Sequence, residues 1–366
     1  MKLLKTKEET VFFEDNDIGR MKKRIFEAGP KEIDRILADD FGFPAESELT
    51  KPDCYIQNTP RHKVEEKRKA NDIVLIPVGC SENHGRHMCS WADTYFVTFI
   101  CEGVRRYTAK KGAAVNLALP PLAYGGHPYH HYGLPGTYPL SQSTVTAVIS
   151  DVMLGLWNDG FRKQIIVNNH GQFWMLESAL QEYMKNYQLP GIYRLMDWHR
   201  AVREAFFTKE RGGDWDTDFI HADEAETSLG LYLFPDKVDM KWAVDTKAET
   251  YLPDGHFGTS VDPIARPSRW SEGEGHFAIE VHSTPEGVVG SATKAEAHKA
   301  KRPLAMICSY ISLLVEQISS AFPPGKVPPV EKVTNRKAKD MEPYLREPLS
   351  PGWKSVYELP GLTTNR

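Results

Sequence analysis

The sequence predicts an α/β protein, a three-layer α/β/α sandwich around a mostly parallel sheet. Short apolar runs rich in β-branched residues recur along the chain, as expected of strands buried on both faces. Stretches with apolar residues at helical spacing separate these runs. Strands that alternate with helices form parallel sheets covered by helices on both faces.

Length and composition are typical of a globular enzyme. The chain has 366 residues, of which 41% are apolar, 26% charged and 11% aromatic. This length favours one large domain with additional segments. A net charge of -4 gives no reason to expect a nucleic-acid or membrane partner, so we expect a small-molecule substrate.

The chain start and the cysteines indicate a cytoplasmic protein. Charges interrupt the first apolar stretch, which is too short for a signal peptide, and we find no apolar run of about 18 residues. The five cysteines include no CxxC pair, and an odd number argues against a disulfide framework. We expect them to be small buried hydrophobic residues.

The elements follow in order along the chain. Residues 1–70 are polar and charged, contain a helical stretch near Gly29 to Ala38, and are predicted to be an N-terminal extension. The core domain is predicted over 71–322, and a tail rich in Pro and Lys over 323–366. Strands are expected at Ile73–Gly79, Ala113–Leu122, Lys163–Asn168 and Gly191–Trp198, and helices after Asp93, from the Ser141 cap to Trp157, at Phe173–Tyr187 and at Lys294–Phe322.

Ionisable residues follow two of these strands. Parallel sheets bind ligands beyond the carboxyl ends of their strands. Glu82, His84, His87 and Asp93 lie within twelve residues after the first strand, and His170 directly follows the third. A mixture of carboxylate and imidazole suits Zn, Mn or Fe better than Ca or Mg. The alternative is that the acids are solvated or cap helices while the histidines make core hydrogen bonds.

A third group of ionisable residues precedes an apolar helix. It contains His221, Asp223, Glu224 and Glu226. One acid near a helix start would be explained by capping, which remains the alternative for Asp223, but four ionisable groups exceed what a cap needs.

Four ordered motifs make the chain resemble the creatininase family. The resemblance covers about residues 70–320 and implies a creatininase-like fold, a homo-oligomer that could be a hexamer, and a metal-dependent hydrolase. The matching segments are PVGCSENHGRHMCSWAD (Pro77–Asp93), HHYGLPGT (His130–Thr137), NNHGQF (Asn168–Phe173, family pattern NGHGGN) and HADEAETS (His221–Ser228, family pattern HAGExETS).

The resemblance also implies roles for individual residues. It implies two divalent ions per chain (Zn, Mn or Fe), and Glu224 or His221 as the proton shuttle. We choose Glu226 over Glu224 as the ligand from the last motif. The implied metal ligands are Glu82, His84, Asp93 as the bridge, His170 and Glu226.

Departures from the family pattern bear on the substrate. Creatininase places a metal-binding acid two residues after the motif histidine, where this chain has Gln172, which argues against creatinine. Arg86 replaces the usual Pro and Asp223 the usual Gly, so the pocket is more charged.

In length and in its loop rich in His and Tyr, the chain resembles the branch that hydrolyses 3-dehydro-scyllo-inosose to 5-dehydro-L-gluconate in inositol catabolism. Amidohydrolysis of creatinine-like rings or formamides remains an alternative, as does a non-catalytic sugar-binding or scaffold protein. The expected substrate contacts are His127, Tyr129, His130, His131, Arg86 and Gln172.

Overall fold

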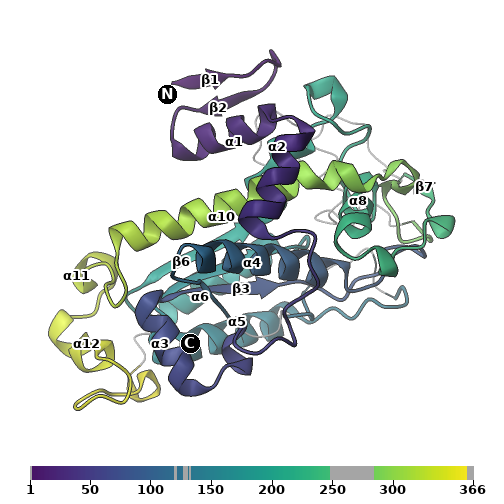
Figure 1. Cartoon of the computed structure of the whole chain (residues 1–366). Coiled ribbons are helices and arrows are strands. Elements are labelled where there is room, and N and C mark those ends of the chain that lie inside the picture. Colours follow the sequence, from purple (N-terminus) through teal and green to yellow (C-terminus); the bar gives the residue numbers. More distant parts are fainter. Residues whose placement is uncertain (1, 119–121, 127–130, 132, 248–283, 361–366) are drawn as a thin grey trace.

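A four-stranded parallel sheet forms the centre of the molecule (Figure 1). The computed structural model describes residues 2–118, 122–126, 131, 133–247 and 284–360. The strands are β3 (Ile73–Val78), β4 (Asn116–Leu117), β5 (Lys163–Asn168) and β6 (Ile192–Asp197), in the spatial order β4-β3-β5-β6. This arrangement confirms the predicted fold class.

The strands separate two apolar layers. Ile73 and Leu75 of β3 face one core, whereas Val74 and Ile76 face the other. This alternation is the period of two that a strand imposes on its side chains. The first layer contains α4 (Ala92–Lys110), α8 (Glu224–Leu233) and α10 (Lys301–Ala321), and the second contains α5 (Gln142–Asn158) and α6 (Phe173–Tyr187).

Most expected elements have the expected bounds. Ser141 caps α5 by accepting a hydrogen bond from the Thr144 amide at 3.3 Å, and β5 and α6 span the expected residues. Within the described residues the second strand is shorter than expected: β4 pairs with β3 at Asn116 and Leu117, and Leu122 bridges to Val78, while residues 119–121 of the expected range lie outside that description.

The last core helix begins later than expected. Two 3-10 turns, Ala292–Lys294 and Ala297–Ala300, precede it, and α10 starts at Lys301 with Pro303 in its first turn, where proline is well tolerated. Among the described residues, this stretch alone (Ala297–Ala321) is long and apolar enough to cross a membrane. Its buried side chains belong to the apolar layer next to α4, so α10 is a core helix.

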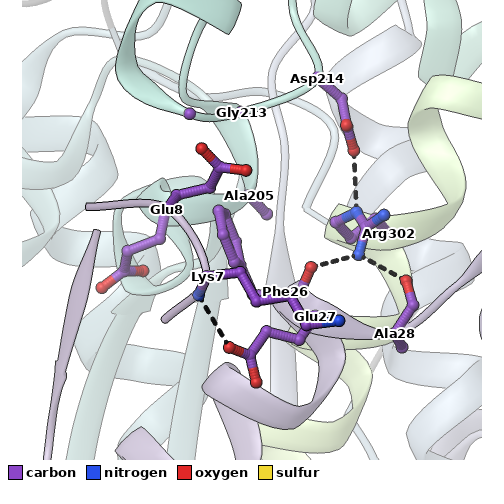
Figure 2. Close-up of a pocket in the computed structure, with 11 residues that line it drawn as sticks. Lys7, Glu8, Phe26, Glu27, Ala28, Ala205, Gly213, Asp214 and Arg302 are labelled. Carbon is purple, nitrogen blue, oxygen red and sulfur yellow. Dashed lines mark hydrogen bonds and ion pairs between the residues drawn. The ribbon is translucent and has the colours of Figure 1, made fainter. Parts of the chain in front are cut away.

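The N-terminal segment packs on the outer side of α10 (Figure 1). It begins with the hairpin of β1 (Leu3–Lys5) and β2 (Phe12–Glu14). Arg302 of α10 donates to the carbonyls of Ile25, Phe26 and Ala28 at the end of α1 and pairs with Asp214, beside the pocket shown in Figure 2. Helices α1 (Asp17–Glu27) and α2 (Pro30–Arg35), with a π-helical turn at Ile36–Phe41, lie against α10. Helix α3 (Arg61–Ala70) lies instead near α12, and its Arg68 pairs with Glu347 (Figure 1).

The chain after α10 covers the opposite apolar layer. Val330, Met341 and Tyr344 pack into the core beneath α5 and α6. This segment contains α11 (Val330–Val333) and α12 (Ala338–Leu345). The other short elements are α7 (Trp198–Ala201), β7 (Asp245–Thr246), β8 (Gly290–Ser291) and 3-10 turns at Ile56–Asn58, Arg203–Phe206, Lys209–Arg211, Pro235–Lys237, Met240–Trp242 and Val356–Glu358.

Candidate metal centre

Three acids and four histidines converge at the carboxyl edge of the sheet. The loop after β3 approaches the start of α4 closely: a Cβ on Gly79 would lie 2.5 Å from the Thr94 Cα, so only glycine fits. This close approach brings the first motif against Asp93 in the first turn of α4. All of the side chains are buried: Glu82, His84, Asp93, His131, His170, His221 and Glu226.

The ligand atoms form two triads that share Asp93. In one triad, His170 Nδ1 lies 2.9 Å from Glu82 Oε2 and 3.3 Å from Asp93 Oδ2. In the other, His84 Nε2 lies 3.6 Å from Asp93 Oδ1 and 3.5 Å from Glu226 Oε2. Ligands about 2.1 Å from a tetrahedral ion are separated by roughly 3.4 Å, so the distances from each histidine to its two carboxylates match the spacing of a metal site.

Backbone carbonyls orient two of the histidines. His84 Nδ1 contacts the Glu82 carbonyl at 3.0 Å, and His221 Nε2 contacts the Asn83 carbonyl at 2.7 Å. A carbonyl only accepts, so each of these nitrogens carries a hydrogen, and in the neutral imidazole the other nitrogen presents a lone pair. His84 Nε2 is buried and makes no hydrogen bond within the described residues, as expected of a nitrogen that binds a metal.

The charges of the centre oppose the effect of burial. Burial raises the pKa of Glu226 well above its usual range, although nearby His84 lowers it. Burial would also raise the pKa of Glu82, but His221 and His170 outweigh it and hold that pKa well below its usual range. For His84 burial lowers the pKa, yet Asp93 and Glu226 raise it overall. A divalent cation would replace protons in such a cluster, so we expect metal affinity to rise with pH.

His131 lies inside this centre. Its Nδ1 is 2.6 Å from Glu82 Oε1, and its ring centroid is 4.2 Å from that of His221. Of the other loop residues expected to contact substrate, His127, Tyr129 and His130 lie outside the described residues.

Gln172 and Arg86 make contacts away from the ligand triads. Gln172 donates to the Gly79 carbonyl and to Asn168 Oδ1, both at 3.0 Å, and accepts from the Gly126 amide at 2.9 Å. The exposed Arg86 guanidinium stacks 3.7 Å from the Trp242 ring centroid. Gln172 therefore links the segments that contain Gly79, Gly126 and Asn168 through hydrogen bonds. Arg86 lies on the surface.

The three acids of the third motif, Asp223, Glu224 and Glu226, make different contacts. Asp223 caps α8 by accepting from the amides of Ala225 and Glu226, which is the capping alternative. Glu224 pairs with Lys299 at 2.6 Å and accepts from Thr217, whereas Glu226 faces His84. Residues two apart on a helix point in different directions, so Glu224 is not among the converging ligand atoms.

Sequence reasoning missed two neighbours of the centre. Cys80, expected to be a small buried hydrophobic residue, lies with Asp93 and His170 in a group whose ligand atoms are within 4.8 Å of one another. Asn169 donates to Asp93 Oδ1 at 2.6 Å. Their positions directly after β3 and directly before His170 were the available signal.

Comparisons with known proteins show the family of the chain. A family model described as Creatininase, creatinine amidohydrolase, matches residues 57–315. A 3-dehydro-scyllo-inosose hydrolase from Thermotoga maritima is 41% identical over 303 residues, which are 83% of this chain and 96% of that protein. A creatinine amidohydrolase from Pseudomonas putida is 30% identical over 210 residues, 54% of this chain and 76% of that protein.

Solved structures share the fold. A creatininase mutant with phenylalanine in place of a tryptophan has a TM-score of 0.56 at 23% identity and covers 74% of this chain and 100% of its own. Two others, described as "Creatininase Mn" and as a glutamine-for-glutamate mutant creatininase of the Zn-Zn type, each have a TM-score of 0.52 at 23% identity. They cover 74% and 76% of this chain and 99% and 100% of their own.

Proposed function

Because the chain belongs to the creatininase family and is therefore a metal-dependent hydrolase, we propose that it opens the ring of 3-dehydro-scyllo-inosose with water to give 5-dehydro-L-gluconate. The main support for this substrate is the 41% identity to a hydrolase of that name, which extends over 96% of that hydrolase. The relative named for creatinine matches only 54% of the chain, at 30% identity.

The reaction requires one water and no redox partner. The water oxygen adds to one ring carbonyl, the adjacent C–C bond breaks, and the carbon that leaves takes up a proton. The products of this cleavage are a carboxylate and a ketone on one open chain. Bound divalent ions would supply an activated water and a polarised carbonyl.

The residues of the centre suit these demands. Glu82, Asp93 and His170 would hold one ion, and His84, Asp93 and Glu226 the other. His221 is our proposed proton carrier, because its Nδ1 lies 3.6 Å from Glu82 Oε1 and 3.8 Å from Glu226 Oε2. His131 would position Glu82 through their 2.6 Å contact.

Several finer points belong to the same proposal. We propose two ions per chain, Zn, Mn or Fe, since both triads combine oxygen and nitrogen ligands. A cytoplasmic homo-oligomer, with a hexamer as the candidate assembly, is proposed on the family resemblance. We also propose the division into residues 1–70, 71–322 and 323–366. The first segment is not a separate domain in this division, because its apolar side chains belong to the core next to α4.

A direct assay tests the substrate. Purified enzyme with added Mn or Zn should acidify a weakly buffered solution of the diketo-inositol as the carboxylic acid forms. Creatinine and a formamide are the comparison substrates, and Asp93→Ala is the control for background hydrolysis. Rapid turnover of creatinine with no effect on the diketo-inositol would favour the amidohydrolase. Protein that retains no Zn, Mn or Fe and turns over none of the three substrates would favour a scaffold or sugar-binding protein.

A further inference from the structure

Asn169 touches the carboxylate shared by the two triads. Its side chain is 2% exposed, and its Nδ2 donates to Asp93 Oδ1 at 2.6 Å. The family pattern NGHGGN has glycine at this position, where this chain reads NNHGQF. A glycine has no side chain, so this contact comes from a residue that departs from the family pattern.

Trp198 fixes the orientation of the Asn169 amide. The indole Nε1 of Trp198, directly after β6, donates to Asn169 Oδ1. An indole N–H can only donate, so it must face the amide oxygen, which leaves the NH₂ group for Asp93. Trp198 is fully buried and packs edge-on against Phe206, with ring centroids 5.5 Å apart.

Asp93 has one oxygen on each side of the centre. Oδ1 faces His84 at 3.6 Å, and Oδ2 faces His170 at 3.3 Å. A carboxylate that bridges two ions must keep this orientation, and rotation about its terminal bond would remove one oxygen from its triad. The contact from Asn169 opposes that rotation, because it holds Oδ1 on the His84 side.

We propose that Asn169, held by Trp198, is a positioning residue that keeps Asp93 in its bridging orientation and so sets the affinity for the second ion. The inference rests on the proposed metal centre and adds a determinant to it. Hydrogen-bond partners of metal ligands typically contribute about 10- to 100-fold in metal affinity.

Zinc affinity measured by competition with a chromogenic chelator tests the role. The full chain is compared with Asn169→Gly, which removes the donor, and with Asn169→Asp, which keeps the size but turns the donor into an acceptor. We expect the weaker-bound zinc to dissociate roughly 10- to 100-fold more readily from Asn169→Gly, and at least as readily from Asn169→Asp. kcat should fall at low zinc and recover partly at high zinc, with KM little changed.

Tryptophan variants provide the matched control. Trp198→Phe keeps a ring but removes the N–H that orients Asn169, so zinc affinity should fall by a smaller factor. Trp157→Phe removes an equally buried indole N–H, which donates to the Pro190 carbonyl far from the centre, and should leave zinc affinity unchanged. Thermal midpoints in excess chelator reveal any loss of folding common to both.

Two results would overturn the inference in different ways. Wild-type protein that binds two zinc ions, together with Asn169 variants that bind them with the same affinity, would remove the role of Asn169 and leave the proposed function intact. Wild-type protein that retains no metal would remove the metal centre, and with it both proposals.

Discussion

The two ends of β3 and β5 each carry a buried ionic cluster, and the clusters differ in how completely they are satisfied. At the amino end, Lys163 pairs with Asp72 at 2.6 Å and donates to the carbonyls of Phe322 and Pro323, while Asp72 also accepts from Gly325. One charge meets one opposite charge there. At the carboxyl end, three carboxylates face histidines, and His84 Nε2 has no hydrogen bond within the described residues.

This difference separates a structural cluster from the proposed metal centre. Burying charge is costly unless the charges are paired and hydrogen-bonded. The Lys163 cluster meets that condition with one fixed charge pair, whereas the acids around Asp93 face histidines, which balance them only when they take up protons or share bound cations with them. Burial of ionisable groups is thus no sign of function by itself, and the balance of charge and hydrogen bonds must be considered.

Replacing Asp93 should have the largest effect on activity and metal binding at the proposed centre. Asp93→Ala removes the oxygens shared by both triads, so we expect activity to fall by roughly 10³-fold or more and metal retention to fall with it. Elemental analysis and the acid-release assay measure the two quantities. Full activity with normal metal content would show that Asp93 is no bridge.

Replacing Lys163 should lower the stability of the fold at the amino end of the sheet without changing metal binding at the carboxyl end. Lys163→Met leaves Asp72 buried and unpaired, which should cost about 3–5 kcal/mol in the free energy of unfolding. Urea denaturation gives this value, and zinc affinity should stay as in the wild type. The double variant Lys163→Met/Asp72→Leu should recover part of the loss. Weakened zinc binding in the single variant would mean that the two ends are coupled.

Removing metal should lower the thermal stability of the protein only by emptying the proposed metal centre at the carboxyl end of the sheet. A ligand at 100 times its Kd stabilises the folded state by about 2.7 kcal/mol, so a strong chelator should lower the thermal midpoint of the wild type by several degrees. Lys163→Met should show a similar additional drop, and Asp93→Ala none. A chelator that shifts Asp93→Ala as much as the wild type would point to a metal bound elsewhere.

The smallest effect is expected from Glu224, two residues from a proposed ligand. Glu224→Gln weakens the pair with Lys299, which keeps Asp216 as a partner, so we expect a loss of about 1–2 kcal/mol in stability with zinc affinity unchanged. Glu226→Gln should instead weaken zinc binding, because it removes a charged ligand. Loss of activity in Glu224→Gln at normal stability and metal content would make Glu224 the proton shuttle.

The sequence predicted the strands that position the centre. A continuous apolar run such as Ile73–Val78 predicts a buried strand in an alternating α/β pattern, and the ionisable residues that follow parallel strands meet at one edge of the sheet. The N-terminal helix α1 was not predicted. Most of its residues are polar or charged, and only one face, which includes Ile25, is buried.

Contacts between distant segments could not be predicted from local patterns. Glu224 and Glu226 are equivalent in the motif until α8 is oriented against Lys299 on one side and His84 on the other. Gln172 follows the motif histidine by two residues, yet the close packing of Gly126 and Gly79 turns it toward backbone groups. Such orientations depend on which surface a helix or loop packs against.

Helix α4 connects the proposed centre to the N-terminal segment. Asp93 lies in its first turn, and farther along Glu102 accepts from Ser47 and Tyr55 while Arg106 donates to the Phe41 carbonyl. A shortened protein that began near α3 would therefore expose the buried acid and apolar side of the helix that carries the shared carboxylate. Anyone trimming this enzyme for crystallisation or industrial use should keep the first sixty residues and place purification tags elsewhere.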